Sequence, residues 1–333
     1  MNIYLHLPST TVERCFKPSD LSRLESAGHI LHYAGEKATP QAWTEHAPEA
    51  EVIITGWGTP AITDEQLEQA AKLRALVHSA GSAKYLLPPS FWTRKLRLGT
   101  ANEALAVGVA ETTLGLIIAG LKNIFPCSAH TRVGEWYAAR SRVGGFTVRE
   151  LYEVSIGIIG ASKVGLHLIR LLKNFEVKIL VMDPYLTPER ARELSVEKVE
   201  LHELMSRCEV VSLHAPALES TRKMLGREQF QAMRNEAIFI NTARGMIVDE
   251  QALVEELRTG RIFAFIDVTY PEPPAADHPF RSLPNCVLLP HMAGAVTNGC
   301  RRQGRSVVEQ IDELTRGQRM HGEVTAEQFA IMA

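Results

Sequence analysis

The sequence contains little cysteine, no large excess of either charge and no tract of biased composition. Its five cysteines (15, 127, 208, 286 and 300) are odd in number and lack C-x-x-C spacing, which favours reduced thiols over a disulfide framework. No Cys/His cluster has metal-binding spacing, so we expect no metal. The formal net charge of −2 gives no electrostatic reason to expect nucleic acid or an anionic membrane as a partner.

Targeting and membrane segments are also missing from the pattern. The opening residues, MNIYLHLPST, have no basic stretch followed by an apolar core, so we expect no signal peptide. We find no apolar run that approaches the roughly 20 residues of a membrane span. The remaining composition, 45% hydrophobic and 22% charged over 333 residues, is ordinary for a soluble, cytoplasmic protein with two domains.

Short apolar, β-branched runs alternate with helical patterns along most of the chain, which predicts an α/β fold of parallel sheets covered on both faces. A long segment with little charge, 103–125, separates two such series and predicts a buried or interface helix. An irregular connector is expected over 128–146. The predicted strands are 2–6, 29–33, 51–55, 74–79, 96–99, 154–159, 177–182, 209–213, 236–241, 263–267 and 285–289, and a final helix is predicted at about 296–316.

The second series opens with the run Gly160-Ala-Ser162-Lys-Val-Gly165, which is close to the dinucleotide-binding turn G-x-G-x-x-G. A predicted strand precedes it and a predicted helix begins at about 163, which is the context that such a turn needs. Ser162 replaces the glycine that lets the backbone approach a pyrophosphate, although its hydroxyl can donate to a phosphate oxygen. We therefore predict that Ser162 changes the affinity for the dinucleotide and preserves the binding mode.

An acidic residue follows the next predicted strand. Asp183 stands about twenty residues beyond the glycine turn, where a carboxylate accepts hydrogen bonds from the adenosine ribose. A carboxylate also repels a 2′-phosphate, and no arginine directly follows, so NAD is favoured over NADP. The pair Asp183-Pro184 also suits a simple turn, but the order of strand, glycine turn, helix, strand and acid favours the dinucleotide interpretation.

Three charged residues follow later predicted strands: Arg244, Glu272 and His291. Each alone suits a solvated loop, a turn or a cap. Because ligands of open α/β sheets bind outside the carboxyl ends of the strands, all three can converge on one cleft. An arginine binds a carboxylate bidentately, a histidine moves a proton at neutral pH, and a carboxylate orients the imidazole. Together they predict hydride transfer on a 2-hydroxy or 2-oxo acid, with the hydride chemistry supplied by the cofactor.

At these positions the chain resembles the D-isomer-specific 2-hydroxyacid dehydrogenases, a family that includes D-lactate, glyoxylate/hydroxypyruvate and phosphoglycerate dehydrogenases. The resemblance covers most of the chain and is densest from about 151 to 295. The motifs that carry it are Glu150-Leu-Tyr152, the 156–165 turn, Ser212-Leu-His214-Ala-Pro216, Asn241-Thr-Ala-Arg244-Gly-Met-Ile-Val-Asp249, Asp267-Val268, Glu272-Pro273 and Pro290-His291-Met-Ala-Gly294.

The resemblance implies an NAD-dependent dehydrogenase or 2-oxo acid reductase in which His291 is the acid/base, Glu272 its partner and Arg244 the ligand of the substrate carboxylate. It implies a flavodoxin-like substrate domain (1–102 and 291–333), an inserted Rossmann domain (103–290) and a homodimer. Asp267 would contact the nicotinamide carboxamide. The other implied cofactor residues are Gly160, Ser162, Lys163, Val164, Asp183, His214, Pro216, Thr221, Thr242, Ala243 and Ala293, and the implied substrate residues of the first lobe are Gly81 and Ser82.

Where the family reads G-V-G-V-D in its first-lobe loop, this chain reads Ser79-Ala-Gly-Ser-Ala-Lys84, so the particular 2-hydroxy acid is not specified. We expect no appended regulatory domain of the kind that many phosphoglycerate dehydrogenases have, which disfavours that role. Two alternatives stay open. Formate-oxidising relatives pair the histidine with glutamine, so Glu272 argues against that reaction. A dinucleotide-sensing interaction protein of corepressor type, with little turnover, is the second. The basic run Arg301-Arg-x-x-Arg305 is interpreted as a solvated helix face.

Overall fold

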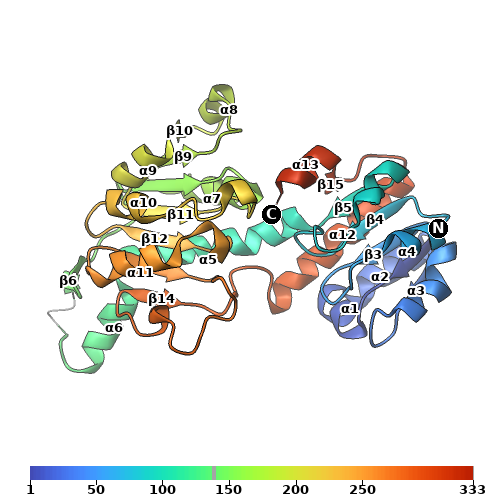
Figure 1. Ribbon diagram of the computed structural model, residues 1–333, viewed down its shortest axis with the longest axis horizontal. Helices are drawn as coiled ribbons and strands as arrows, with labels where there is room; N and C mark the ends of the chain where they lie inside the picture. Colours follow the sequence, from blue (N-terminus) through green and yellow to red (C-terminus); the bar gives the residue numbers. More distant parts are fainter. Residues whose placement is uncertain (137–139, 333) are drawn as a thin grey trace. The chain divides into compact units, whose positions relative to one another are not determined.

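The computed structural model describes residues 1–136 and 140–332, and it confirms the predicted α/β class. The chain divides into two compact units, which we call unit 1 (1–106 and 295–333) and unit 2 (107–294) (Figure 1). Unit 1 is therefore built from both ends of the chain, and unit 2 from one continuous segment. Each unit has its own sheet and its own core.

The sheet of unit 1 has six strands in the order β15-β5-β4-β3-β1-β2. Its first five strands in sequence are parallel and begin and end within two residues of their predicted bounds, while β15 pairs antiparallel to β5 at the edge. The bounds are β1 Asn2–Leu5, β2 Ile30–Tyr33, β3 Val52–Thr55, β4 Ala75–His78, β5 Arg97–Thr100 and β15 Glu323–Val324.

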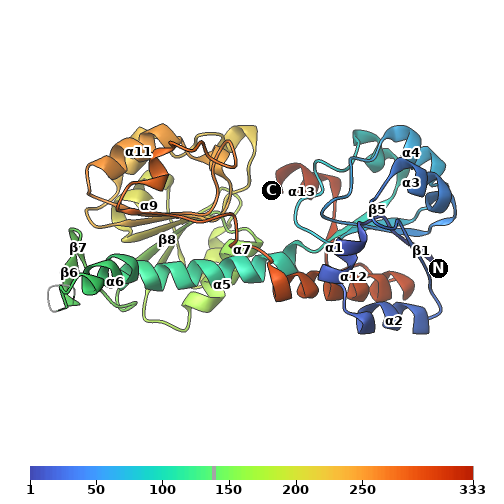
Figure 2. The same ribbon diagram turned by 90° about the horizontal axis from the view of Figure 1, so that it is seen from below.

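Helices cover both faces of this sheet (Figure 2). One apolar core lies under α1 (Ser9–Cys15), α2 (Pro18–Ser26) and α12 (Cys300–Thr315). The other lies under α3 (Pro40–His46) and α4 (Asp64–Gln69), together with a 3-10 turn, η2 (Pro89–Arg94). Because both faces are covered, the central strands are apolar without alternation, as the fully buried β3 shows.

The sheet of unit 2 has seven strands, all parallel, in the order β10-β9-β8-β11-β12-β13-β14. Each strand predicted in this half of the chain is present, and the short edge strand β10 is an addition. The bounds are β8 Ser155–Ile159, β9 Lys178–Met182, β10 Glu197–Lys198, β11 Val210–Leu213, β12 Ile238–Asn241, β13 Phe263–Ile266 and β14 Cys286–Leu288.

The two faces of the unit 2 sheet are covered by different sets of helices (Figure 2). One core contains side chains of α9 (Leu201–Arg207), α10 (Arg227–Ala232) and α11 (Glu250–Arg258). The other contains side chains of α5 (Asn102–Leu121), α7 (Lys163–Leu172) and α8 (Pro188–Glu193). The remaining elements are η1 Ala47–Glu49, α6 Ile124–Arg132, β6 Arg142–Val143, β7 Phe146–Thr147, η4 Glu219–Thr221, η5 Gly245–Ile247, η6 Pro279–Arg281, η7 Thr297–Gly299 and α13 Ala326–Ile331.

The predicted end of the long helix over 103–125 is wrong, because α5 ends at Leu121 and a second helix, α6, begins at Ile124. Asn123 makes the break: it adopts a left-handed φ of 51°, and its buried side-chain amide donates to the carbonyl of Val143 at 2.9 Å. The connector predicted over 128–146 therefore contains the end of α6 and the β6/β7 hairpin, and its residues 137–139 lie outside the described part of the chain.

By length and composition, α5 is the one helix among the described residues that is able to cross a membrane, so the statement from sequence that no apolar run approaches the length of a membrane span is wrong. Helices in the core of a folded domain pass the same test. Four of its side chains, Ala110, Leu116, Ile117 and Leu121, pack into the unit 2 core. The absence of a membrane span stays a prediction, and the packing of α5 is what supports it.

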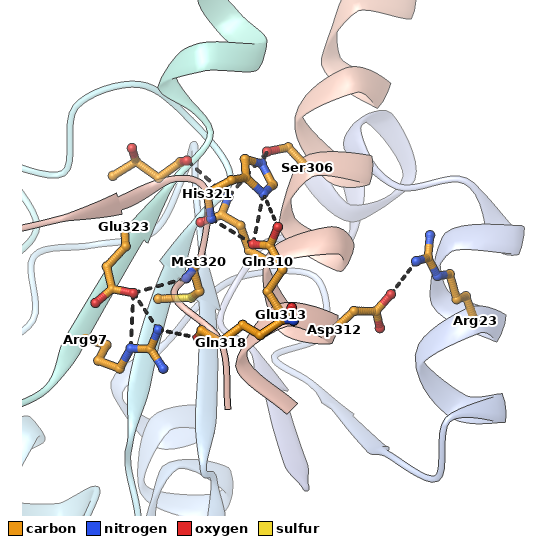
Figure 3. A network of polar contacts seen from close by, with 11 residues as sticks. Arg23, Arg97, Ser306, Gln310, Asp312, Glu313, Gln318, Met320, His321 and Glu323 are labelled. Carbon is orange, nitrogen blue, oxygen red and sulfur yellow. Dashed lines mark hydrogen bonds and ion pairs between the residues drawn. The ribbon is translucent and has the colours of Figure 1, made fainter. Parts of the chain in front are cut away.

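Polar contacts attach the C-terminal segment to unit 1 (Figure 3). The His321 ring accepts or donates at both nitrogens, with Glu313 Oε2 3.0 Å from Nδ1 and Ser306 Oγ 2.8 Å from Nε2. Glu323 of β15 forms an ion pair with Arg97 of β5. These contacts, together with the β15–β5 pairing, hold the last part of the described chain on α12 and on the sheet.

Candidate active site

Arg244, Glu272 and His291 lie beyond the ends of three adjacent strands of unit 2. Arg244 follows β12, Glu272 follows β13 and His291 follows β14. These strands are parallel neighbours in the sheet, so their carboxyl ends share one edge (Figure 1). The strand-end rule that predicted their convergence from the sequence thus has the topology that it requires.

The imidazole of His291 is hydrogen-bonded to Glu272. Nδ1 lies 2.6 Å from Oε1 of the carboxylate, and the two side chains are 46% and 40% exposed. A carboxylate at Nδ1 holds the proton on that nitrogen, so Nε2 is left free to exchange a proton with a ligand. The pair has the geometry of a general acid–base with its orienting partner, and it is open to solvent as such a pair must be.

The loop that carries His291 is held by Asp267, which is buried at the end of β13. Its carboxylate accepts hydrogen bonds from the backbone N–H groups of Met292 (2.8 Å) and Ala293 (2.9 Å). Its carbonyl accepts from the N–H of His291 at 2.9 Å, where the backbone has a left-handed φ of 52°. Asp267 therefore positions the histidine loop, a task that the sequence did not indicate. Its predicted contact with a nicotinamide carboxamide stays a prediction.

Arg244 has no carboxylate within 4 Å among the described residues, although it is partly buried. Its Nη1 donates to the carbonyl of Ala243 at 2.6 Å. Burial lowers the pKa of Arg244 and the nearby charge of Glu272 opposes this. A guanidinium that is partly removed from water without an anionic partner is unfavourable, and an anionic ligand removes that penalty.

Gly245 brings the Arg244 loop against the loop that carries Glu272. A Cβ at Gly245 would lie 2.1 Å from the carbonyl carbon of Thr269, so only glycine fits there. The next residue, Tyr270, donates its backbone N–H to Glu250 Oε1 at 2.7 Å. Close backbone packing of this kind fixes the spacing between the arginine and the glutamate.

Glu250 and His278 form a second carboxylate–imidazole pair that the sequence did not indicate. Glu250 Oε2 lies 3.3 Å from His278 Nε2, and burial raises the pKa of Glu250. Glu250 is the first residue of α11. His278 lies six residues beyond Glu272, in the loop between β13 and β14, so the pair attaches that loop to the start of α11. No local motif marks either residue, because the contact joins segments 28 positions apart.

The glycine turn between β8 and α7 has the shape of a phosphate-binding turn. Gly160 has a φ of 98°, and a Cβ there would lie 2.7 Å from the backbone nitrogen of Ala215. A Cβ on Gly165 would lie 2.1 Å from the carbonyl oxygen of Gly160. Both glycines are therefore required by the close approach of backbone to backbone. The turn leaves the N-terminus of α7, with Lys163 and Val164 in its first turn, at the carboxyl edge of the sheet.

Ser162 is the N-cap of α7. Its hydroxyl oxygen accepts a hydrogen bond from the N–H of Gly165 at 3.4 Å. At the middle position of the turn, where the fingerprint has glycine, this chain therefore has a serine whose side chain accepts a hydrogen bond from the first turn of the helix. Its hydroxyl hydrogen is not used by that bond and remains available to a phosphate oxygen.

Asp183 lies beside the same turn, because β9 is the neighbour of β8. Its Oδ2 accepts from the N–H of Ala161 and its Oδ1 from the N–H of Tyr185, each at 2.7 Å. The carboxylate is therefore oriented at the edge where an adenosine ribose is expected to lie. Its second lone pairs are directed away from these two amides and stay available to hydroxyl donors.

The other residues implied for the cofactor flank this turn on the next strands. His214 follows β11, and burial lowers its pKa to about 3, so its imidazole is neutral. Thr221 donates to the carbonyl of Pro216 at 2.6 Å. Thr242, which precedes Ala243 beyond β12, shares a 3.1 Å hydrogen bond with Thr113 of α5. All of them lie in unit 2.

Sequence comparison decides the family. The profile of a family described as "D-isomer specific 2-hydroxyacid dehydrogenase, NAD binding domain" matches residues 114–293, more than half of the chain. The chain belongs to this family. The family model describes an NAD-binding domain, and the matched residues form most of unit 2, so this chain has a domain that binds a nicotinamide dinucleotide on a Rossmann fold.

Proteins with several different names are similar to this chain. The D-3-phosphoglycerate dehydrogenase of Methanocaldococcus jannaschii is 32% identical over 88% of this chain, which spans only 56% of that relative's length. The mitochondrial formate dehydrogenase 2 of Oryza sativa is 30% identical, with 89% of this chain and 79% of the relative covered. The glyoxylate reductase of Korarchaeum cryptofilum is 30% identical, with 83% and 86% covered. A phosphoglycerate oxidoreductase from Rhizobium etli has a TM-score of 0.83, at 26% identity and 98% coverage of both chains.

The residues present in unit 2 fit a dinucleotide. An added Cβ at Gly160 or Gly165 would fill the glycine turn, the positive end of the α7 dipole lies at this turn, and Asp183 is oriented by the N–H groups of Ala161 and Tyr185. The implied substrate residues Gly81 and Ser82 belong to unit 1, in the loop after β4. Their role rests on the resemblance alone.

The carboxyl edge of the unit 1 sheet carries histidines of a different kind. His6 and His78 are fully buried, and burial lowers the pKa of each to about 4. His78 Nδ1 lies 3.0 Å from the hydroxyl of Thr55, and His6 Nδ1 lies 2.8 Å from the hydroxyl of Tyr4. Both imidazoles are therefore neutral parts of the core.

Proposed function

We propose that this protein transfers a hydride between NAD(H) and C2 of a small 2-hydroxy or 2-oxo acid, with D stereospecificity as its family name states. The observation that carries the proposal is the Glu272–His291 hydrogen bond of 2.6 Å near the guanidinium of Arg244, which has no carboxylate within 4 Å among the described residues, at adjacent strand ends. An acid–base pair next to a site for an anion is what a 2-oxo acid requires.

His291 is assigned as the acid and base. In the direction of reduction, Nε2 gives its proton to the C2 oxygen as that oxygen gains negative charge, and in oxidation it removes the hydroxyl proton. Glu272 keeps the other ring proton on Nδ1 and stabilises the imidazolium form. The cofactor, when bound, supplies or accepts the hydride.

Arg244 is assigned as the ligand of the substrate carboxylate. Its planar donors suit two carboxylate oxygens, and the positive charge beside the C2 carbonyl favours the charge that develops on that oxygen. Gly81 and Ser82 are proposed to donate backbone N–H groups to the same carboxylate, as the resemblance implies.

NAD is proposed as the preferred dinucleotide. Asp183 is already oriented by two backbone amides, and a carboxylate at this position repels a 2′-phosphate. The dissociation constants of NADH and NADPH, measured by fluorescence titration, test this. Tighter binding of NADPH would contradict the proposal.

The decisive experiment is a turnover assay with NADH and a panel of glyoxylate, hydroxypyruvate, pyruvate and phenylpyruvate. We expect oxidation of NADH with at least one of them. Clear binding of NADH without turnover of any 2-oxo acid would instead favour the dinucleotide-sensing interaction protein.

Formate oxidation is the second candidate, because formate dehydrogenases are among the similar proteins. Removal of a hydride from formate breaks a C–H bond and transfers no hydroxyl proton, so it has no use for the His291–Glu272 proton pair. Reduction of NAD by formate in the same assay would overturn our preference for a 2-hydroxy acid.

Assembly and location are also proposals. Ile124 (48% exposed), Phe125 (47%) and Val133 (74%) are exposed apolar side chains on and after α6 of unit 2, which supports self-association. We infer a cytoplasmic homodimer. Light scattering after gel filtration tests the dimer, and a monomer at micromolar concentration would refute it.

A further inference from the structure

The loop between β13 and β14 carries Glu272 and is attached to α11 on both sides of that residue. Two residues before Glu272, the N–H of Tyr270 donates to Glu250 Oε1 at 2.7 Å. Six residues after Glu272, the Nε2 atom of His278 lies 3.3 Å from Glu250 Oε2. Glu250 stands in the first turn of α11. One carboxylate of a different element therefore contacts the loop with both of its oxygens, on either side of the proposed partner of the histidine.

The Glu272 side chain depends on its backbone for its position. Among the described residues its one hydrogen bond joins Oε1 to His291 Nδ1, at 2.6 Å, and the side chain is 40% exposed. Arg244 contributes a nearby charge and no hydrogen bond to this carboxylate. No side chain outside the acid–base pair thus fixes where the Glu272 carboxylate lies, and the attachment of its loop takes that role.

The two ring nitrogens of His278 have different tasks. Nδ1 accepts a hydrogen bond from the backbone N–H of Phe280 at 3.3 Å, at the start of η6. That bond uses the lone pair of Nδ1, so the ring carries its hydrogen on Nε2, the nitrogen that lies beside Glu250. The loop therefore presents a donor to each oxygen of Glu250, one from Tyr270 and one from His278.

Glu250 is partly removed from water, and its loop partners offset the cost. Its side chain is 16% exposed, and burial raises its pKa, while the Tyr270 N–H and the His278 ring oppose that rise. The N-terminus of a helix also favours an acidic residue, but that preference does not require contact with the loop. Loss of either loop contact would leave a largely buried oxygen without a donor, which is unfavourable. The carboxylate and the loop thus hold each other in one arrangement.

Contacts within the loop pass this arrangement on to Glu272. The hydroxyl of Thr269 donates to the carbonyl of Pro271 at 2.9 Å. The Arg281 guanidinium donates to the carbonyls of Ala275 and Pro274, at 2.9 and 3.0 Å. These bonds limit the internal freedom of the loop, so a displacement where it meets Glu250 also displaces the residues between.

We propose that Glu250 is a positioning residue for the acid–base pair. Through its two loop contacts it holds the Glu272 carboxylate at hydrogen-bonding distance from His291 Nδ1. A carboxylate at Nδ1 stabilises the imidazolium form, so Glu250 determines indirectly how tightly the ring holds its proton. This role rests on the proposed function, in which His291 gives that proton to the substrate.

The pH dependence of kcat/KM for a 2-oxo acid, measured in the direction of reduction, tests this role. Reduction needs the protonated imidazole, so kcat/KM falls at alkaline pH. Glu272→Gln should move the midpoint of that fall to lower pH by about 1 unit or more, because an opposite charge is lost. Glu250→Ala should move it in the same direction by about 0.5 unit, with the dissociation constant of NADH unchanged. An unchanged midpoint in Glu250→Ala, beside a shifted one in Glu272→Gln, would overturn the proposal.

A purely structural role would give a different result. Loss of folded protein lowers kcat/KM by the same factor at every pH and does not move the midpoint. If Glu250→Ala does not fold, Glu250→Gln replaces it, because its amide oxygen can still accept from Tyr270 while its amide N–H meets the Nε2–H of His278. Glu255→Gln is the matched control: Glu255 lies on the same helix, and its carboxylate is paired with Arg227 instead of the loop. It should leave the midpoint where it is in the native protein.

The contact with His278 is tested by a conservative variant. His278→Gln retains an N–H donor for Glu250 and should shift the midpoint less than His278→Leu, which has none. Equal shifts in the two variants would show that the contact with Glu250 is not what acts on the acid–base pair.

The double variant Glu250→Ala/Glu272→Gln separates action through Glu272 from any other route. Without the Glu272 carboxylate there is no charge left to position, so the midpoint should equal that of Glu272→Gln alone. A further shift in the double variant would mean that Glu250 acts on His291 by another route and would overturn the proposal.

An NMR titration of the His291 ring provides a readout that needs no turnover. Its signal is identified by its absence from the spectrum of His291→Asn. We expect a lower titration midpoint in Glu250→Ala than in the native protein, and equal midpoints would overturn the positioning role. Turnover of a 2-oxo acid with equal midpoints would leave the proposed function intact. No turnover of any 2-oxo acid would overturn the proposed function, and the titration would still decide whether Glu250 acts on His291.

Discussion

The two sheets of the molecule carry histidines at corresponding places, just beyond or at the carboxyl ends of parallel strands. In unit 2, His291 is 46% exposed and bonded to a carboxylate. In unit 1, His6 and His78 are fully buried and bonded to hydroxyls, and burial lowers the pKa of each to about 4. The same side chain at the same kind of edge is exposed and paired with a carboxylate in one unit, where we propose that it carries a proton, and is a neutral part of the core in the other.

The surroundings account for the difference. A carboxylate partner and access to water allow an imidazole to gain and lose a proton, while burial beside hydroxyls excludes the charged form. Strand register places Thr55 beside His78, so the unit 1 histidine meets a hydroxyl on the neighbouring strand. The position of a histidine at a strand end is therefore insufficient to identify a candidate catalytic residue. The hydrogen-bonding partner of the imidazole and its exposure to water separate the two kinds of histidine.

The strongest test of this contrast is His291→Asn. We expect kcat to fall by about 10²- to 10⁴-fold, the usual contribution of general acid–base catalysis, with the dissociation constant of NADH nearly unchanged. Steady-state kinetics and NADH titration provide the two measurements. Turnover close to that of the native protein would remove His291 from its assigned role and the contrast with it.

Arg244→Met should have the next largest effect. Loss of a charged hydrogen-bonding partner is expected to lower kcat/KM for a 2-oxo acid by about 10- to 100-fold. Arg244→Lys should recover only part of this, because an ammonium lacks the planar pair of donors. If Arg244→Met changed the affinity for NADH and not the kinetics of the 2-oxo acid, the guanidinium would belong to the cofactor site.

For the buried His78 we expect an effect on stability and none on the proposed proton transfer. Its pKa is 6.5 in an unfolded chain and about 4 in the folded protein, so unfolding takes up a proton between these values. The contribution is complete above pH 6.5 and is lost as the pH falls toward 4, by up to about 1.4 kcal/mol per pH unit for one histidine. Urea unfolding of the native protein and of His78→Gln, from pH 7 to 4.5, should show a shallower pH dependence in the variant. Parallel curves would mean that His78 titrates normally.

Ser162→Gly should have the smallest effect. The glycine removes a helix cap and allows closer backbone approach, and we expect the dissociation constant of NADH to change by less than about 10-fold. Gly165→Ala is the control, because its Cβ would lie 2.1 Å from the carbonyl oxygen of Gly160 and should prevent the turn from forming. No binding of NADH to the native protein, and binding to Ser162→Gly, would show that the serine blocks the site.

Much of the fold follows from local pattern. Each predicted strand is present, because short apolar runs bounded by turns form strands in most α/β chains. The last predicted helix corresponds to α12, which begins four residues later than predicted, and the short helix α13 beyond it was not predicted. The end of α5 was missed because Asn123 breaks the helix through a contact with Val143, twenty residues away. A helix pattern contains no trace of such a contact.

The candidate site divides in the same way. Arg244, Glu272 and His291 were predicted because each follows a strand, and the strand order brings such positions to one edge, while their roles stay predictions. Asp267 was assigned only to the cofactor, although its carboxylate holds the histidine loop. Glu250 and His278 were not found, since their pairing depends on how a long loop folds back onto α11. Contacts between residues of a folded loop can be identified only from a structure, whereas residues at strand ends can be identified from the sequence.

The two-residue strand β15 has a consequence for solubility. It is the outermost strand of the unit 1 sheet and pairs with β5 through Glu323 and Val324. Without it, β5 would present a row of unpaired N–H and C=O groups, which is a template on which another chain can add a strand. Disruption of the polar contacts that hold this segment, for example at His321 or Arg97, should therefore appear first as association between molecules in storage or on heating, before any loss of chemistry.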